Sequence, residues 1–111
     1  MVQKYNLKRL DAIEGKVYRQ NLINNIFPEL SNIAATNLMD SIIYAGQMSL
    51  KYLDKKSMEI AYDKLTDYIR QNIKANNYSF MGSIVHRIWN TCALYNLKFV
   101  CRVRNLFGIN L

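Results

Sequence analysis

The acid, base and thiol side chains of this chain are few, and their spacing does not suit catalysis. His86 is the only histidine, and Cys92 lies six residues further along the same predicted helix, on a different face. The most closely spaced pair of aspartates, Asp63 and Asp67, shares one helix face with Lys64 close by. Zinc sites need three or four ligands at a recognisable spacing, which the sequence does not offer. We therefore expect a solvent-facing acidic pair, a partly exposed structural histidine, and no catalytic, cofactor-binding or metal-binding residue.

A stronger chemical signal is the cationic and aromatic character of the C-terminal part. Residues 68–111 contain six Lys or Arg and no acid, whereas residues 1–67 contain nine Lys or Arg and eight acids. A basic field of this kind attracts phosphate-bearing partners, such as lipid headgroups, nucleic acid or nucleotide sugars, although solvated basic helix faces are an equally good interpretation. The residues expected to form a membrane-facing or anion-facing surface are Arg87, Trp89, Lys98, Phe99, Arg102, Arg104 and Phe107.

The same segment carries an apolar stripe with helical spacing. Its members follow one another at intervals of three or four residues: Ile84, Ile88, Cys92, Tyr95, Phe99, Val103 and Leu106. The stripe predicts one unbroken helix from about residues 81–83 to Gly108, with Arg87, Lys98 and Arg102 projecting mostly away from the stripe. Such a helix can lie in a membrane interface, or it can be an ordinary bundle helix with its apolar face in the core. Both interpretations need the same stripe, so both stay open.

Three further helices are expected before this segment. Asn6 can cap a first helix that ends near Ile26, because the residue before Pro28 is pushed out of helical geometry. A second helix starts at Ser31, continues to Leu53 and is apolar over most of its surface, which predicts a central position. A third begins at residue 57 and carries a buried stripe to residue 73, and residues 75–79 are expected to form a loop. The sequence thus predicts a single all-α domain over residues 1–111, a bundle of about four main helices.

Two short motifs resemble a known family. Residues 5–14, YNLKRLDAIE, and residues 27–30, FPEL, are similar to the start of the helical C-terminal region of bacterial family 2 glycosyltransferases of the capsule and lipopolysaccharide type. Softer similarities continue through residues 62–70 and 94–108. The resemblance implies that the complete enzyme transfers a sugar from a nucleotide donor during surface polysaccharide synthesis. In that family a divalent metal is held by an Asp-x-Asp pair of the catalytic domain.

This chain has no Asp-x-Asp pair and no alternating pattern for a nucleotide-binding sheet. We therefore expect it to be inactive alone and to form the non-catalytic C-terminal part of such an enzyme, with the catalytic domain as its partner. In that role it would brace the catalytic domain and dock at the inner membrane. The alternative is a self-contained basic helical interaction protein that binds nucleic acid or a partner protein. Eight tyrosines favour base stacking, but no named nucleic-acid-binding motif is present.

The cysteines and the N-terminus bear on location. In a continuous helix Cys92 and Cys101 are too far apart for a disulfide, and unpaired thiols suit a reducing compartment. Residues 1–6 lack the apolar core of a signal peptide, and no run of about twenty apolar residues is present. We expect a cytoplasmic location, with peripheral association at the inner membrane.

Overall fold

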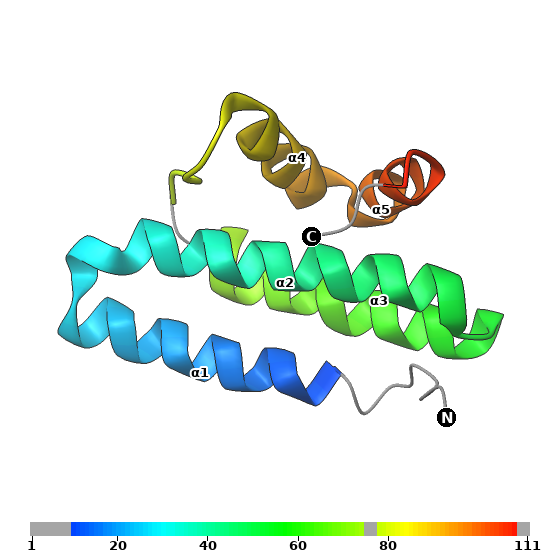
Figure 1. The fold of residues 1–111 in the computed structure, drawn as a ribbon. Coiled ribbons are helices and arrows are strands. Elements are labelled where there is room, and N and C mark those ends of the chain that lie inside the picture. Colours follow the sequence, from blue (N-terminus) through cyan, green and yellow to red (C-terminus); the bar gives the residue numbers. More distant parts are fainter. Residues whose placement is uncertain (1–9, 75–77, 109–111) are drawn as a thin grey trace, which may run out of the picture.

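Every regular element that the structure describes is helical. The computed structural model describes residues 10–74 and 78–108, which form five α-helices joined by short connectors (Figure 1). The helices are α1 (Asp11–Ile26), α2 (Ser31–Tyr52), α3 (Lys55–Ile69), α4 (Ile84–Tyr95) and α5 (Leu97–Leu106). The predicted all-α class is therefore confirmed, with five helices in these residues where about four were expected.

Local sequence signals explain where several helices begin and end. α1 ends at Ile26, as predicted from Pro28, and a 3-10 turn over Pro28–Leu30 leads directly into α2. α3 begins at Lys55, two residues earlier than expected, because the Asp54 carboxylate caps it by accepting a hydrogen bond from the Ser57 backbone N–H at 2.7 Å. This hydrogen bond lowers the pKa of Asp54. The predicted cap at Asn6 lies outside the described residues.

Helix α2 lies at the centre of the molecule, as its apolar surface predicted. It contacts α1, α3, α4 and α5, and Figure 1 shows it between α1 on one side and the α4–α5 pair on the other. The largest apolar side chains that it buries are at most 1% exposed: Leu38, Met39, Ile42 and Ile43. A helix buried on several sides must be apolar over most of its surface, because neighbours remove nearly all of it from water.

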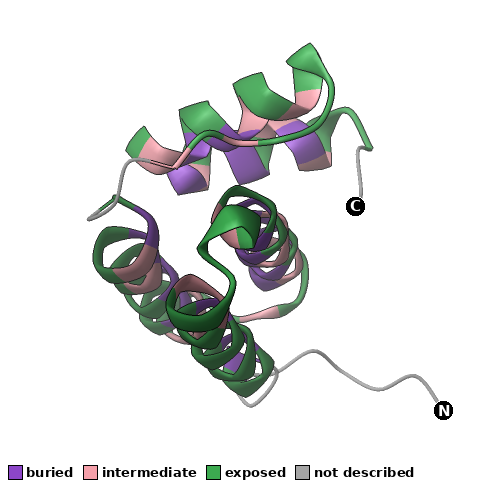
Figure 2. Cartoon of the chain, turned by 90° about the vertical axis from the view of Figure 1, so that its left-hand side faces the viewer, coloured by how far each residue is buried: buried purple, intermediate pink, exposed green. Residues whose placement is uncertain are grey.

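The helices form two layers. α1, α2 and α3 pack side by side, and α4 and α5 lie across them as a second layer (Figure 2). The residues of α4 and α5 that face the three-helix layer are buried, and those that face away are exposed. α4 and α5 therefore have one face in the core and one face in solvent.

The two layers approach each other closely at Gly46 of α2. The Tyr62 hydroxyl donates a 2.7 Å hydrogen bond to the Gly46 carbonyl, and the Cys101 thiol lies beside the same glycine. A Cβ atom at position 46 would lie 2.6 Å from Cys101 Sγ. Burial raises the pKa of Cys101 to about 11, so its thiol stays protonated and donates to the Ile43 carbonyl. The glycine allows the thiol and the phenol to pack against the backbone of α2.

Gly46→Ala is therefore expected to lower the free energy of unfolding. Overpacking typically destabilises a fold by about 1–3 kcal/mol. The higher helix propensity of alanine offsets at most about 1 kcal/mol of this loss. Gly15→Ala is the matched control, because a Cβ there meets nothing within 4 Å and should stabilise α1 by roughly 0.5–1 kcal/mol. Urea unfolding measures both changes. Equal gains for the two variants would show that the layers do not meet closely at Gly46.

Candidate functional site

The C-terminal layer is two helices, not the single helix that the stripe predicted. Asn96 leaves helical geometry at φ −154° and ψ 82°, and its side chain accepts a hydrogen bond from the Phe99 backbone N–H at 3.1 Å. Asparagine is a strong N-cap, so it ends α4 and starts α5 within a continuous apolar pattern. Cys92 and Cys101 therefore belong to different helices; both are free, with Cys92 exposed and Cys101 buried.

Helix α4 attaches to α2 through polar side chains. The Nε2 atom of His86 lies 2.6 Å from Asp40 Oδ1, and the Asn90 amide donates to the same oxygen at 3.3 Å. His86 is half-buried, in agreement with the structural role predicted for it. The Ser83 hydroxyl caps α4 by accepting from the His86 backbone N–H at 3.2 Å, which fixes the histidine at the first turn.

Helix α5 attaches to α2 through Arg104. Its Nε atom donates to Gln47 Oε1 at 3.1 Å, and its guanidinium lies 5.3 Å from the centre of the Trp89 ring. The side-chain amide of Asn105 donates to the backbone carbonyl of Gln47, and the side-chain amide of Gln47 donates to Asn105 Oδ1. Arg104 is 3% exposed, and burial lowers its pKa, although a guanidinium stays charged in proteins.

These contacts show that the prediction was wrong for two residues that were expected at the surface. Arg104 is buried, and Trp89 is half-buried against the core, so neither lies on a docking surface. The physical reason is hydrogen bonding, because an unpaired buried polar group costs more than an exposed apolar one. The face that turns inward is the one whose polar groups, apart from the Asn90 Oδ1 atom, find partners on α2. That face consists of Asn90, Ala93, Leu97, Val100, Cys101 and Arg104.

The predicted apolar stripe points mainly into solvent. Ile84 is 72% exposed, Tyr95 77% and Leu106 80%, so the stripe is not the core-facing side of a bundle helix. We define the outer face as the exposed apolar side chains of the second layer: Ile84, Val85, Ile88, Cys92, Tyr95, Phe99, Leu106 and Phe107. Of the predicted surface residues, Phe99 and Phe107 belong to it. Val103 is half-buried, so it is the stripe member that the structure does not place there.

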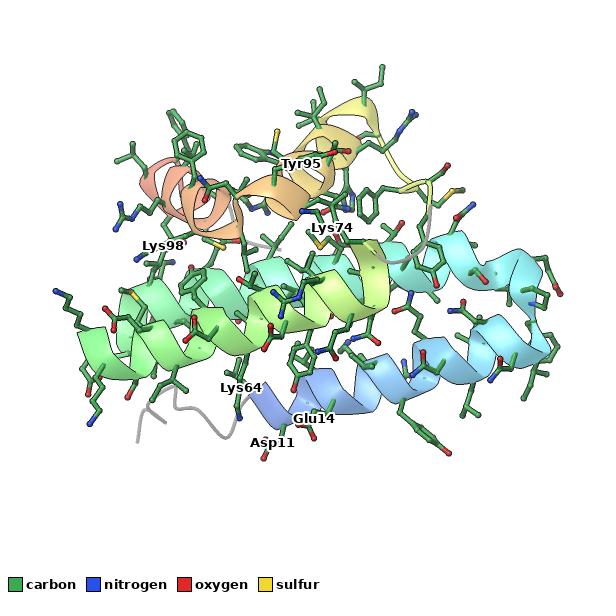
Figure 3. The ribbon with its side chains drawn as sticks, turned by 180° about the vertical axis from the view of Figure 1, so that it is seen from behind. Asp11, Glu14, Lys64, Lys74, Tyr95 and Lys98 are labelled. Atoms are coloured by element: carbon green, nitrogen blue, oxygen red, sulfur yellow. The ribbon has the colours of Figure 1, made fainter. Side chains whose placement is uncertain are left out.

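Cationic side chains accompany the outer face. Arg87 and Arg102 are exposed, as predicted, whereas Lys98 is half-buried with its Nζ 5.9 Å from the centre of the Tyr62 ring. Figure 3 shows Lys74 beside Tyr95, and its Nζ lies 5.2 Å from the ring centre. Lys74 follows α3, so sequence spacing gave no reason to group it with α4; only its place in the acid-free segment pointed to it. The prediction that cations and apolar residues occupy opposite faces is wrong.

The outer face is also slightly hollowed on α4. A shallow cavity of about 290 Å³ is lined by Ile84, Arg87, Ile88, Thr91 and Cys92. Its walls are mainly apolar, and a guanidinium stands beside it. An arrangement of this kind accepts an apolar chain next to a negatively charged group.

Other predicted features also have clear positions. Asp63 and Asp67 are exposed, as expected, and Arg70 pairs with Asp67. Within residues 10–74 and 78–108, no three His, Cys, Asp or Glu side chains gather closely enough to hold a metal ion. In the same residues, no helix is both long enough and apolar enough to cross a membrane.

Comparison of the chain with models of protein families, with curated proteins and with solved structures gave no match.

Proposed function

We propose that this chain is a helical docking domain that binds anionic membrane surfaces through the outer face of α4 and α5. The observation that carries the proposal is the exposure of large apolar side chains beside the exposed cations Arg87 and Arg102, in a segment without acids. Helices that lie in a membrane interface combine these properties: aromatic and aliphatic groups enter the headgroup region, and cations meet anionic lipid.

Charge and exposure favour a lipid surface over nucleic acid. Ile84, Val85 and Ile88 are 55–72% exposed, and aliphatic side chains neither stack on bases nor hydrogen-bond to them. Transfer of these groups out of water is favourable by roughly 25 cal/mol per Å² of apolar surface. The same groups would add little to a contact with phosphates alone, which depends on cations.

We further propose that the domain is the non-catalytic C-terminal part of a family 2 glycosyltransferase, which it braces and brings to the inner membrane. The support is the resemblance of the N-terminal motifs, and their described residues have architectural roles. Leu10 and Ile13 are buried in the core, and Glu14 accepts a hydrogen bond from the Tyr68 hydroxyl at 3.1 Å. Burial, reinforced by this hydrogen bond, raises the pKa of Tyr68 to about 12. A reading frame that encodes an Asp-x-Asp domain immediately upstream supports this assignment, and an unrelated upstream sequence contradicts it.

The membrane proposal predicts binding to anionic vesicles that depends on exposed cations. Each Lys or Arg near such a surface contributes about 1 kcal/mol, so the double variant Arg87→Gln/Arg102→Gln should bind roughly thirtyfold more weakly. Co-sedimentation with vesicles that contain phosphatidylglycerol measures the change. Higher salt should weaken binding of the unmodified protein, because salt screens exposed charges. Lys55→Gln/Lys56→Gln is the control, since it removes two exposed charges at the start of α3.

A second variant separates a membrane from nucleic acid. Ile84→Ser/Ile88→Ser keeps every charge and removes two exposed aliphatic groups, so it should weaken vesicle binding and leave any nucleic-acid affinity unchanged. If the unmodified chain ignores anionic vesicles at low salt but shifts a nucleic-acid probe, the alternative function takes the place of the membrane proposal. Concentration-dependent self-association without vesicle binding overturns it as well, because the outer face would then be covered by a second copy.

A further inference from the structure

A second apolar surface lies at the end of the molecule where α1 turns into α2. Figure 2 looks at this end, and the connector between the two helices is exposed there. Six apolar side chains of this stretch are 42–67% exposed, and we call them the end patch: Tyr18, Leu22, Ile26, Phe27, Leu30 and Ile33. None of them belongs to the outer face, so the end patch is independent of the proposed membrane docking.

The second half of α1 has its polar and apolar sides reversed. At the start of the helix the buried side is apolar, with Leu10 and Ile13 at most 4% exposed. Two turns later the buried side carries Gln20, whose two amide atoms lack a hydrogen-bond partner among residues 10–74 and 78–108, while Leu22 and Ile26 are exposed on the opposite side. A helix that packed only against its own core would place these residues the other way round, because burying an unpaired amide is unfavourable and burying an aliphatic group is favourable. The reversal indicates that the exposed side of α1 also has a partner.

The charge of the end patch differs from that of the whole chain. Residues 18–33 contain one base, Arg19, and one acid, Glu29, so this stretch is neutral in a chain with a net charge of +7. Both side chains are exposed, and neither forms an ion pair with a residue that the structure describes. An anionic surface would gain little here, whereas two positively charged copies of the chain repel each other least at a neutral patch. The charge therefore favours a second copy of this chain over a membrane or nucleic acid.

We propose that two copies of the chain form a symmetric dimer through their end patches. Arg19, Leu22 and Ile26 share one face of α1, because they are spaced by three and four residues, and Glu29 lies in the turn just past the end of this helix. When two α1 helices pack antiparallel across a twofold axis, Leu22 of each copy lies opposite the partner's Ile26. Arg19 then lies about 4.5 Å beyond the partner's Ile26 along the helix axis, level with the turn that carries the partner's Glu29. Apolar groups thus meet apolar groups, and each cation meets an acid, twice in the dimer.

Analytical ultracentrifugation over a range of concentrations tests the proposal. The chain should pass from monomer to dimer as its concentration rises and form nothing larger, because a twofold contact is closed. Leu22→Ser/Ile26→Ser changes only exposed side chains, so it should keep the helical content and weaken dimerisation at least about tenfold. Ile84→Ser/Ile88→Ser is the matched control on the outer face and should change dimerisation by less than about twofold. A monomer at every concentration up to about 1 mM, or a dimer that the control variant abolishes, overturns the proposal.

Charge reversal tests the paired positions without removing an apolar group. At low salt, Arg19→Glu and Glu29→Arg should each weaken dimerisation at least about fivefold, because both ion pairs of the dimer become pairs of like charge. An equimolar mixture of the two variants should dimerise about as well as the unmodified chain, because every pair of positions 19 and 29 in the mixed dimer again joins opposite charges. If the mixture associates no better than either variant alone, these two residues do not face each other and the proposed dimer is wrong, whatever the outcome for Leu22→Ser/Ile26→Ser.

Discussion

Leu38→Ala and Ile42→Ala are each expected to lower the free energy of unfolding by about 2–5 kcal/mol. Leu38 is 1% exposed and Ile42 is fully buried, and both lie on α2, the helix that packs between α1 and the α4–α5 pair. Truncation removes apolar contacts and leaves a cavity that the surrounding helices cannot fill completely. A domain of this size is typically stable by about 5–15 kcal/mol, so either change removes a large part of that stability.

Urea unfolding followed by circular dichroism measures the effect as a lower midpoint at an unchanged slope. Ile33→Ala is the matched control on the same helix, because Ile33 is 47% exposed and its truncation should cost less than about 1 kcal/mol. Losses below about 0.5 kcal/mol at both Leu38 and Ile42 would mean that α2 is peripheral. The two-layer packing described above would then be wrong.

The fold could be predicted from the sequence where a local signal was sufficient. Pro28 marks the end of α1, and the long apolar surface of α2 indicates its central position. The start of α3 lies two residues before the predicted residue 57, because the Asp54 carboxylate caps the helix. These features depend on residues within a few positions of one another, so propensity and periodicity describe them well.

The orientation of α4 and α5 could not be predicted in the same way. The exposed stripe and the buried face both recur with helical spacing, and the stripe is the more apolar of the two. The choice depends on partners 46–58 residues away, such as Asp40 for His86 and Gln47 for Arg104 and Asn105. Periodicity describes one segment at a time and carries no information about such partners. The sequence therefore predicts a surface in this segment, but it includes Trp89, which is half-buried, and Arg104, which is buried.

Arg104→Ala and Arg102→Ala should differ sharply in their effect on stability. Both remove one charge from the same turn of α5, but Arg104 is 3% exposed and Arg102 lies in solvent. Loss of Arg104 removes its hydrogen bond to Gln47 and its contact with Trp89, and it leaves a buried carbonyl oxygen of the Gln47 side chain without this donor. A hydrogen bond to a charged group is worth about 1.5–3 kcal/mol and a cation–π contact about 0.5–2 kcal/mol, so we expect a total loss of about 2–5 kcal/mol.

Arg102→Ala should change stability by no more than about 0.5 kcal/mol, as is usual for an exposed side chain. Thermal and urea unfolding of the two variants, at the same pH and ionic strength, give the comparison directly. Vesicle binding should show the reverse order: Arg102→Ala weakens it, and Arg104→Ala leaves it unchanged at temperatures where that variant is folded. Equal stability of the two variants would place Arg104 in solvent. The stripe would then be free to face the core, and the outer face would no longer support membrane docking.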